Sequence, residues 1–291
     1  MKKIIKKISK LLNYFYVLIK SKGDFIILNA WIEIKYGKIE KRNFGDELNY
    51  YMLSELTGKQ IAGYYNICHL KKQSDLMFIG SLVEDFTTPN SIIWGSGAIS
   101  GDKPLRHAPK RVCAVRGKLT RQYLLEKGVN CPEVYGDPAL LLPHIYKSDV
   151  CKKYKVGFIP HIHDLNSSIV KRISKLNKVH LIRFNNYQDW HDIIDEINEC
   201  EIIISSSLHG IIISDAYNIP NVWIKLSDRI EGGSFKFLDY FSAVNRNTKQ
   251  PLCVNEKTTL EDIVKEAKSY VPIHFDIKPL IAACPIKIKL L

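Results

Sequence analysis

EIIISSSLHGIIISDAYNIPNVWIKL, residues 201–226, is the stretch that decides the fold expected for this chain. Its apolar run at 202–204 has the length and the β-branched content of a buried parallel strand. The chain becomes apolar again through 211–217, as in a helix, and enters another strand at 221–224 after a turn that contains Pro220. The stretch therefore predicts a strand, a loop, a helix and a second strand in succession.

The polar loop of this unit carries the first candidate site residues. They are Ser205, Ser206, Ser207, Leu208, His209 and Gly210. Open α/β sheets bind ligands beyond the carboxyl ends of their strands, where this loop is expected to lie. Serine hydroxyls and free N–H groups at a helix start suit an anion, and His209 can transfer protons near neutral pH. The alternative is that a serine only caps the helix and that His209 is structural.

Similar strand–loop–helix units recur along the chain and extend this interpretation to most of it. Their strands are expected at 25–33, 76–81, 91–96, 111–115 and 133–138, and then at 155–160 and 179–183. Such repetition predicts parallel, doubly wound sheets, so the expected fold class is α/β with two Rossmann-like domains facing a cleft. The predicted divisions are an N-terminal basic amphipathic helix at 1–22, a first domain at 23–145, a second domain at 155–250, and a C-terminal helix and tail at 251–291.

Further candidate residues follow the other predicted strands. In the first half they are Asn43, Gly45, Asp46, Gly95, Ser96, Gly97, Arg116 and Asp137, and in the second half they are His161 and Lys236. Gly45 permits a tight turn, and Asp46 can cap the helix that follows. The loop at 95–97 can approach a phosphate closely, although it is too short to be a P-loop.

Two cations among these candidates are expected to bind an anion. The guanidinium of Arg116 can hold a phosphate or a carboxylate bidentately. As a plain surface residue at a helix start, Arg116 would face the positive end of the helix dipole, which is unfavourable. Lys236 is the second candidate, with a solvated lysine as the alternative.

Composition and spacing weigh against other classes of site. The formal net charge of +12 over 291 residues indicates anionic partners, but no helix-turn-helix, zinc-finger or RNP pattern points to nucleic acid. His161, His163 and Asp164 form an H-x-H-D pattern without an obvious further ligand, so no metal site is expected. Seven scattered cysteines without a C-x-x-C pair indicate reduced thiols in the cytoplasm.

The first 22 residues, MKKIIKKISKLLNYFYVLIKSK, contain seven lysines between apolar residues at helical spacing. This pattern is typical of an amphipathic basic helix that lies on an anionic membrane, and the segment is too short and too charged to span one. The expected location is therefore cytoplasmic, with peripheral attachment to the inner face of the membrane. The alternative is a helix that packs on the protein's own surface.

Seven motifs in one order resemble the polysaccharide pyruvyl transferase family. They are NFGDELN (43–49), WGSGAI (94–99), VRGKLT (115–120), YGDPALLLP (135–143), VGFIPH (156–161), SSSLHGIIISDAYNIP (205–220) and FKFLDY (235–240). The resemblance covers roughly residues 25–246. It implies two Rossmann-like domains similar to those of GT-B glycosyltransferases. It also implies transfer of the pyruvyl group of phosphoenolpyruvate to two hydroxyls of a glycan or lipid-linked oligosaccharide, with no cofactor.

The resemblance also implies roles for individual residues. His209 and Arg116 are expected to be catalytic, and the other candidates to bind substrate. Some family members have an arginine two positions before this histidine, where this chain has Ser207. Lys236 is then the candidate replacement cation. The rival hypotheses are a GT-B glycosyltransferase that uses a nucleotide sugar, and a non-catalytic membrane-associated binding protein.

Overall fold

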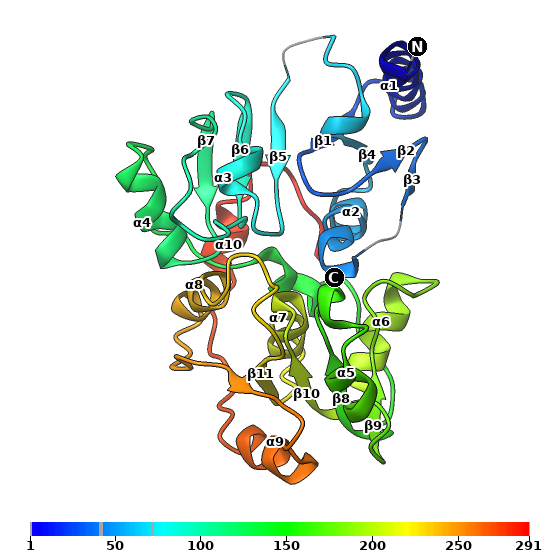
Figure 1. Cartoon of the computed structure of the whole chain (residues 1–291). Coiled ribbons are helices and arrows are strands. Elements are labelled where there is room, and N and C mark those ends of the chain that lie inside the picture. The colour runs from blue at the N-terminus through cyan, green and yellow to red at the C-terminus, as the bar shows by residue number, and fades with distance from the viewer. Residues whose placement is uncertain (1, 41–42, 71–72, 291) are drawn as a thin grey trace.

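The computed structural model describes residues 2–40, 43–70 and 73–290, and it consists of two α/β halves built on separate parallel sheets (Figure 1). In the first half, five short apolar segments form a sheet in the order β4-β1-β5-β6-β7, and neighbouring strands are parallel. Its strands are β1 (Phe25–Leu28), β4 (Gln60–Gly63), β5 (Asp75–Met77), β6 (Ser91–Trp94) and β7 (Arg111–Ala114). Its helices are α2 (Phe44–Thr57), α3 (Val83–Phe86) and α4 (Lys118–Glu126). The hairpin β2 (Ile34–Lys35) and β3 (Lys38–Ile39) was not predicted, because its strands are too short to show periodicity.

The second half has the order β12-β11-β10-β8-β9, again with parallel neighbours. Its strands are β8 (Tyr154–Ile159), β9 (Val179–Leu181), β10 (Cys200–Ser205), β11 (Asn221–Lys225) and β12 (Leu252–Cys253). Its helices are α5 (Ser168–Ile173), α6 (Trp190–Asn198), α7 (Leu208–Ala216), α8 (Phe235–Ala243) and α9 (Leu260–Ala267). The α/β class with parallel sheets flanked by helices is therefore confirmed. The predicted unit at 201–226 is present, although α7 begins at Leu208, so His209 and Gly210 belong to its first turn rather than to a loop.

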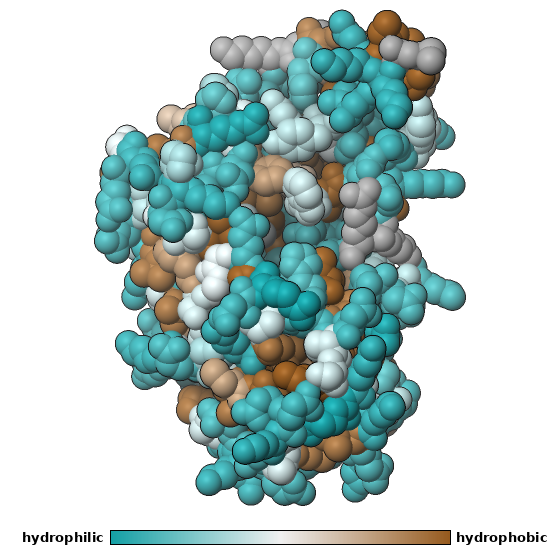
Figure 2. Space-filling view, viewed as in Figure 1, coloured by the Kyte–Doolittle hydropathy of each residue, from teal (hydrophilic) through white to brown (hydrophobic). Residues whose placement is uncertain are grey.

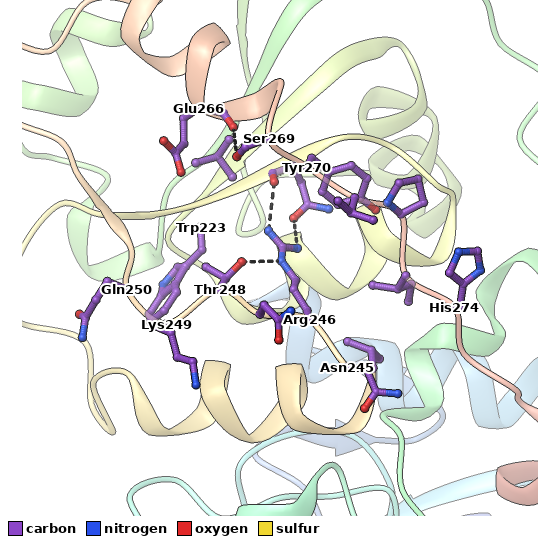
Figure 3. Close-up of a pocket in the computed structure, with 17 residues that line it drawn as sticks. Trp223, Asn245, Arg246, Thr248, Lys249, Gln250, Glu266, Ser269, Tyr270 and His274 are labelled. Carbon is purple, nitrogen blue, oxygen red and sulfur yellow. Dashed lines mark hydrogen bonds between the residues drawn. The ribbon is translucent and has the colours of Figure 1, made fainter.

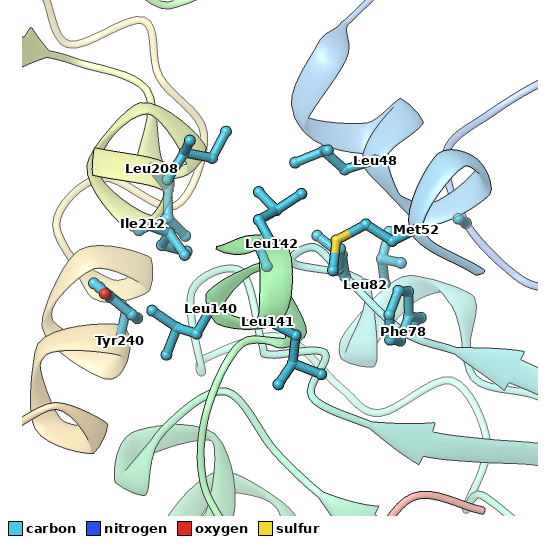
Figure 4. Close-up of a cluster of buried hydrophobic side chains, with 14 of the residues drawn as sticks. Leu48, Met52, Phe78, Leu82, Leu140, Leu141, Leu142, Leu208, Ile212 and Tyr240 are labelled. Atoms are coloured by element: carbon cyan, nitrogen blue, oxygen red, sulfur yellow. The ribbon is translucent and has the colours of Figure 1, made fainter. Parts of the chain in front are cut away.

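One hydrophobic core continues from the first half into the second. The connecting segment η2 (Pro138–His144) packs against α7, and Leu140, Leu141 and Leu142 enter the space between the halves. There they meet Leu48 and Met52 of α2 on one side. Leu208 and Ile212 of α7 lie on the other side (Figure 4). Burial of these side chains favours a fixed arrangement of the two halves.

The C-terminal segment serves both halves. β12 completes the second sheet and α9 packs against β10 and β11, after which the chain returns to the first half at α10 (Lys278–Ala282). The indole nitrogen of Trp94 donates to the Leu280 carbonyl at 2.8 Å, and the Lys289 N–H donates to the Leu56 carbonyl at 2.7 Å. The divisions of the chain at 1–22, 23–145, 155–250 and 251–291 remain predictions.

The helix α1 (Lys2–Lys20) lies at the outer end of the first half (Figure 1). The C-terminal part of this helix packs on the first half of the molecule, where Tyr14 and Val17 are buried against Ile27 and Ala62. Asn13 donates to the carbonyls of Ile34 and Asn66, at 3.1 and 2.9 Å. No helix among the described residues is long and apolar enough to cross a membrane.

Candidate functional site

A cavity of about 620 Å³ lies between the two halves, and it gathers residues that are far apart in the sequence. Seven of the predicted site residues line it, namely Asn43, Asp46, His161, Ser207, Leu208, His209 and Lys236. The first turns of α2, α7 and α8 all contribute to its wall. Helix N-termini carry partial positive charge and free N–H groups, so this wall suits an anion.

His209 lies in the first turn of α7 and is only 8% exposed. A side-chain carbon on Gly45 would overlap the His209 ring, so the start of α2 can approach the imidazole only because residue 45 is glycine. Burial, with the nearby charges of Arg116 and Lys236, lowers the pKa of His209 to about 3. The ring is therefore neutral near pH 7, and its Nε2 has no hydrogen-bond partner among the described residues.

Asp46 provides a carboxyl group in the same cavity. It is the third residue of α2, whose N-cap is Asn43, so the prediction that Asp46 caps the helix is wrong. Instead Asn43 Nδ2 donates to Asp46 Oδ2 at 2.7 Å. Burial raises the pKa of Asp46 to about 6, against the opposing effects of Asn43 and Lys236. Its carboxyl group can therefore exchange a proton near neutral pH.

Lys236 and His161 complete the polar part of the cavity. Burial and the charge of Arg116 lower the pKa of Lys236 to about 8, while Asp46 and Glu231 act in the opposite direction. Burial, Lys236 and His163 lower the pKa of His161 to about 3. Nδ1 of His161 accepts a hydrogen bond from the His163 N–H at 3.3 Å, which places the proton of the neutral ring on Nε2.

Arg116 does not line this cavity. Its side chain is fully buried, and its Nε donates to Asp239 Oδ2 at 2.9 Å across the two halves. Its Nη1 donates to Ser81 Oγ at 2.6 Å, and its Nη2 donates to the Ala98 carbonyl at 2.5 Å. The guanidinium thus joins the halves and acts on His209 and Lys236 through its charge. Direct binding of an anion by Arg116 remains a prediction.

The loop at Gly95, Ser96 and Gly97 supports Arg116 and does not reach the cavity. A side-chain carbon on Gly97 would overlap the guanidinium, and Gly95 has a φ of +99° that suits glycine. The following N–H groups are occupied, because those of Ile99, Ser100 and Gly101 donate to the Glu84 carboxylate, the last at 2.8 Å. Glu84 was not predicted, since a single glutamate in a four-residue helix gives no sequence signal.

The remaining predicted residues have structural contacts. Ser205 Oγ donates to the Ile159 carbonyl at 3.0 Å, and Ser206 Oγ accepts from the His161 N–H at 2.9 Å. Gly210 packs directly on the Ser205 hydroxyl, which a Cβ would overlap. Asp137 is the buried N-cap of η2 and accepts from the Ala139 N–H at 2.9 Å. Burial raises the pKa of Asp137 to about 7.

Three aromatic residues that were not predicted line the mouth of the cavity. Trp31, Tyr65 and Phe86 form an edge-to-face group, with the Phe86 ring 5.6 Å from that of Trp31 and 5.7 Å from that of Tyr65. Trp31 is 67% exposed, which is unusual for so large an apolar side chain. The strand predicted at 25–33 included Trp31, whereas β1 ends at Leu28, so no sequence signal pointed to this group.

Two further features do not extend this site. They are the possible metal ligands of the described residues and a second cavity. Among residues 2–40, 43–70 and 73–290 no group of three or more His, Cys, Asp or Glu side chains could hold a metal ion. A separate cavity of about 560 Å³ shares no residue with the first, and Arg246 lies in its wall (Figure 3). Arg246 donates to Asn221 Oδ1 at 2.7 Å and to Thr248 Oγ1 at 3.1 Å. These contacts hold the arginine in place within the protein.

Comparison with known proteins identifies the family. A model of the polysaccharide pyruvyl transferase family matches residues 4–228, which is more than half of the chain. The chain belongs to this family. The match includes every predicted site residue of this family member except Lys236, which lies beyond the end of the match.

Two curated relatives are similar over most of their length. The succinoglycan biosynthesis protein ExoV of Rhizobium meliloti (strain 1021) is 27% identical over 240 residues, which cover 80% of this chain and 71% of ExoV. The uncharacterized protein L143 of Acanthamoeba polyphaga mimivirus is 26% identical over 226 residues, covering 75% and 77% of the two chains. No solved structure matches significantly.

Proposed function

We propose that this protein transfers the pyruvyl group of phosphoenolpyruvate to two hydroxyls of a glycan sugar, giving a cyclic ketal and phosphate. One observation carries the proposal: in a chain of the pyruvyl transferase family, Lys236, Asp46 and His209 meet at three helix N-termini in a single cavity. The similarity to a succinoglycan biosynthesis protein supports a polysaccharide as the product. We further propose that the halves cooperate as in GT-B enzymes, at the cytoplasmic face of a membrane.

The donor has a phosphate and a carboxylate, so its site must supply cations and N–H groups. We assign the phosphate to the start of α7, where Ser207 lies, and to the ammonium of Lys236. Lys236 thereby replaces the arginine that some family members carry at position 207. A bound dianion would also raise the pKa of His209, because it offsets the positive charges that lower this pKa in the free protein.

The first chemical step adds a sugar hydroxyl to the double bond of the donor. The hydroxyl oxygen bonds to C2, its proton passes to the Asp46 carboxylate, and protonated His209 gives a proton to C3, which becomes a methyl group. In the second step the other hydroxyl bonds to C2 while the C2–O bond to phosphate breaks. Its proton passes to His209, and Asp46 returns its proton to the departing phosphate. Both side chains are then restored, and Lys236 stabilises the charge on phosphate.

The acceptor needs a surface that a sugar ring can cover. The aromatic group of Trp31, Tyr65 and Phe86 lies at the mouth of the cavity and provides one. We expect Trp31→Ala to raise the KM for the acceptor roughly 10-fold and to leave the KM for phosphoenolpyruvate unchanged, as for a lost aromatic contact. Leu125→Ala removes an exposed apolar side chain from α4 and is the matched control.

The function is tested by incubating the protein with phosphoenolpyruvate and candidate glycans while phosphate release is followed. We expect turnover that depends on both substrates, and a mass increase of the glycan that corresponds to a ketal-linked pyruvate. No turnover together with no binding of phosphoenolpyruvate would contradict the proposal. Protection against heat by a nucleotide sugar alone would favour a glycosyltransferase. A cellular phenotype that survives His209→Ala would favour a non-catalytic binding protein.

A further inference from the structure

The helix α1 has two opposite faces, and the protein covers only one of them. Asn13, Tyr14 and Val17 face the first sheet and are buried. Six large apolar side chains are exposed along the helix: Ile4 (65%), Ile5 (60%), Ile8 (52%), Leu12 (54%), Phe15 (43%) and Ile19 (74%). At the ideal rotation of an α-helix they fall within an arc of about 100°, and we call them the apolar stripe. Figure 2 shows hydrophobic side chains at this end of the molecule.

The charge of α1 specifies what can cover the stripe. The helix contains six lysines and no acidic residue. Five of them lie within its first ten residues, on the side away from the stripe. An apolar face opposed by a cationic face matches the interface of a bilayer that contains anionic lipids. A second copy of the helix would bring the same positive charge and no acidic residue to pair with it, so like-charge repulsion disfavours self-association through α1.

Three hollows that share lining residues follow one another from α1 to His209, and we call this series the groove. The cavity that contains His209 adjoins a second hollow of about 420 Å³, and the two share Trp31, Asp46 and Tyr65. That hollow adjoins a third, of about 370 Å³, through Lys6, Tyr65 and Asn66. Lys2, Lys6 and Lys10 of α1 line the third hollow, together with Ile5 and other residues. The lysine side of the helix therefore faces the outer end of the groove.

We propose that α1 is an interfacial membrane helix, whose apolar stripe lies among the acyl chains of an anionic bilayer. In this orientation the outer end of the groove lies at the lipid headgroups. A glycan carried on a lipid phosphate can then enter beside Lys2, Lys6 and Lys10 and extend past Trp31 to His209. The role of the groove rests on the proposed pyruvyl transfer, whereas the binding of α1 to a membrane does not.

Co-sedimentation of the full chain with vesicles tests the membrane contact without any substrate. We expect binding to vesicles of phosphatidylcholine with about one third phosphatidylglycerol to exceed binding to pure phosphatidylcholine by at least about 10-fold, and to weaken with salt. The double variant Ile8→Asp/Leu12→Asp should lower binding to the anionic vesicles at least about 10-fold, because it places charge in the stripe. Lys3→Glu/Lys7→Glu should lower it to a similar extent through the loss of lipid attraction.

Leu125→Asp is the matched control, since it adds the same charge to an exposed leucine on α4 and should bind vesicles as the original protein does. Thermal unfolding of each variant verifies that the fold is kept. Absence of binding, or binding that Ile8→Asp/Leu12→Asp leaves unchanged, would overturn the proposal. So would a lipid-free dimer that this variant dissociates, because the stripe would then be a contact between copies. Failure of phosphoenolpyruvate turnover alone would leave the vesicle result standing and would overturn only the pyruvyl transfer.

Discussion

At the scale of single residues, the cavity combines groups whose pKa values are displaced toward neutrality from opposite sides. Asp46 is raised to about 6 and Lys236 is lowered to about 8, mainly by burial in both cases. Asp46 and Lys236 also favour each other's charged forms. An enzyme that must move two protons and release phosphate needs a carboxylate and an ammonium to coexist at one pH. Between about pH 6 and pH 8, Asp46 is ionised and Lys236 is still protonated, so both charged groups are present together.

Lys236→Met is expected to weaken phosphoenolpyruvate binding by roughly 10- to 100-fold, the size of a lost charge-assisted hydrogen bond. Lys236→Arg should retain more affinity because it keeps the charge. Since the pKa of Lys236 in the free protein is about 8, the Kd of the original protein for phosphoenolpyruvate should rise as the pH increases beyond that value. Calorimetric titration at several pH values measures both effects. Lys249→Met, in the wall of the separate cavity, is the control, and equal losses in the two variants would argue against a donor site at Lys236.

Asp46→Asn is expected to lower kcat by about 100- to 1,000-fold, as for the loss of a proton-transfer group. In the donor complex, where the bound dianion favours protonated His209, kcat should increase with pH as Asp46, whose pKa is about 6 in the free protein, becomes ionised, and this limb should vanish in the variant. A pH profile that keeps its limb in Asp46→Asn would show that another group titrates.

The same substitution has an opposite consequence for stability. Because burial raises the pKa of Asp46 from 3.8 to about 6, the folded protein binds more protons than the unfolded chain between these values. This contribution to stability is present below about pH 4 and is lost as the pH rises to about 6. Asp46→Asn should therefore raise the Tm at pH 7.5 and leave it nearly unchanged at pH 4. A lower Tm at pH 7.5 would indicate that the ionised carboxylate stabilises the fold.

At the scale of elements, the site depends on how closely α2 and α7 approach each other. The first turn of α2 meets the His209 ring at Gly45, where no side chain fits. The hydrophobic pattern predicted both helices, yet it contained no information on this contact. A glycine at the start of a helix indicated a turn, whereas the structure shows that it is needed for a close approach between elements. Local patterns of one element do not reveal such pairings.

Gly45→Ala is expected to displace the His209 ring and to destabilise the protein by about 1–3 kcal/mol, the usual cost of overpacking. Activity should fall with it, since His209 loses its position. In the double variant Gly45→Ala/His209→Ala the overlap disappears, so the stability lost by Gly45→Ala should be largely recovered. Chemical denaturation of the four proteins of this cycle measures the coupling. Additive effects would show that residue 45 and the imidazole do not touch.

At the scale of the whole molecule, most strands of the two sheets could be predicted, although not β4 or β12, and the contact between the sheets could not. Runs of β-branched residues such as 202–204 indicate buried strands wherever they occur in a chain. The partner of Arg116 is Asp239, which is 123 residues away, and no local pattern connects them. The buried arginine therefore looked like an anion ligand. Several candidates do follow strands as predicted, but the strand expected at 133–138 is reduced to a bridge at Tyr135. Only the arrangement of the halves separates the residues that line the cavity from those that join the sheets.

The Arg116–Asp239 pair provides the test at this scale. Arg116→Met should destabilise the protein by about 3–5 kcal/mol, because Asp239 is left buried without its partner. The double variant Arg116→Met/Asp239→Leu removes both charges and should regain part of that stability. It also leaves the Thr120 N–H and hydroxyl without the carboxylate that accepts from them, so the recovery should be incomplete.

The same double variant distinguishes two roles for Arg116. If the guanidinium acts only by joining the halves and through its charge, the folded double variant should still bind phosphoenolpyruvate with at most about a 10-fold loss, since a charge without direct contact has a modest effect. The loss of its positive charge should also raise the pKa of His209, which NMR titration of the imidazole can follow. Complete loss of donor binding by a protein with normal unfolding behaviour would show instead that Arg116 turns toward the cavity and holds the donor directly.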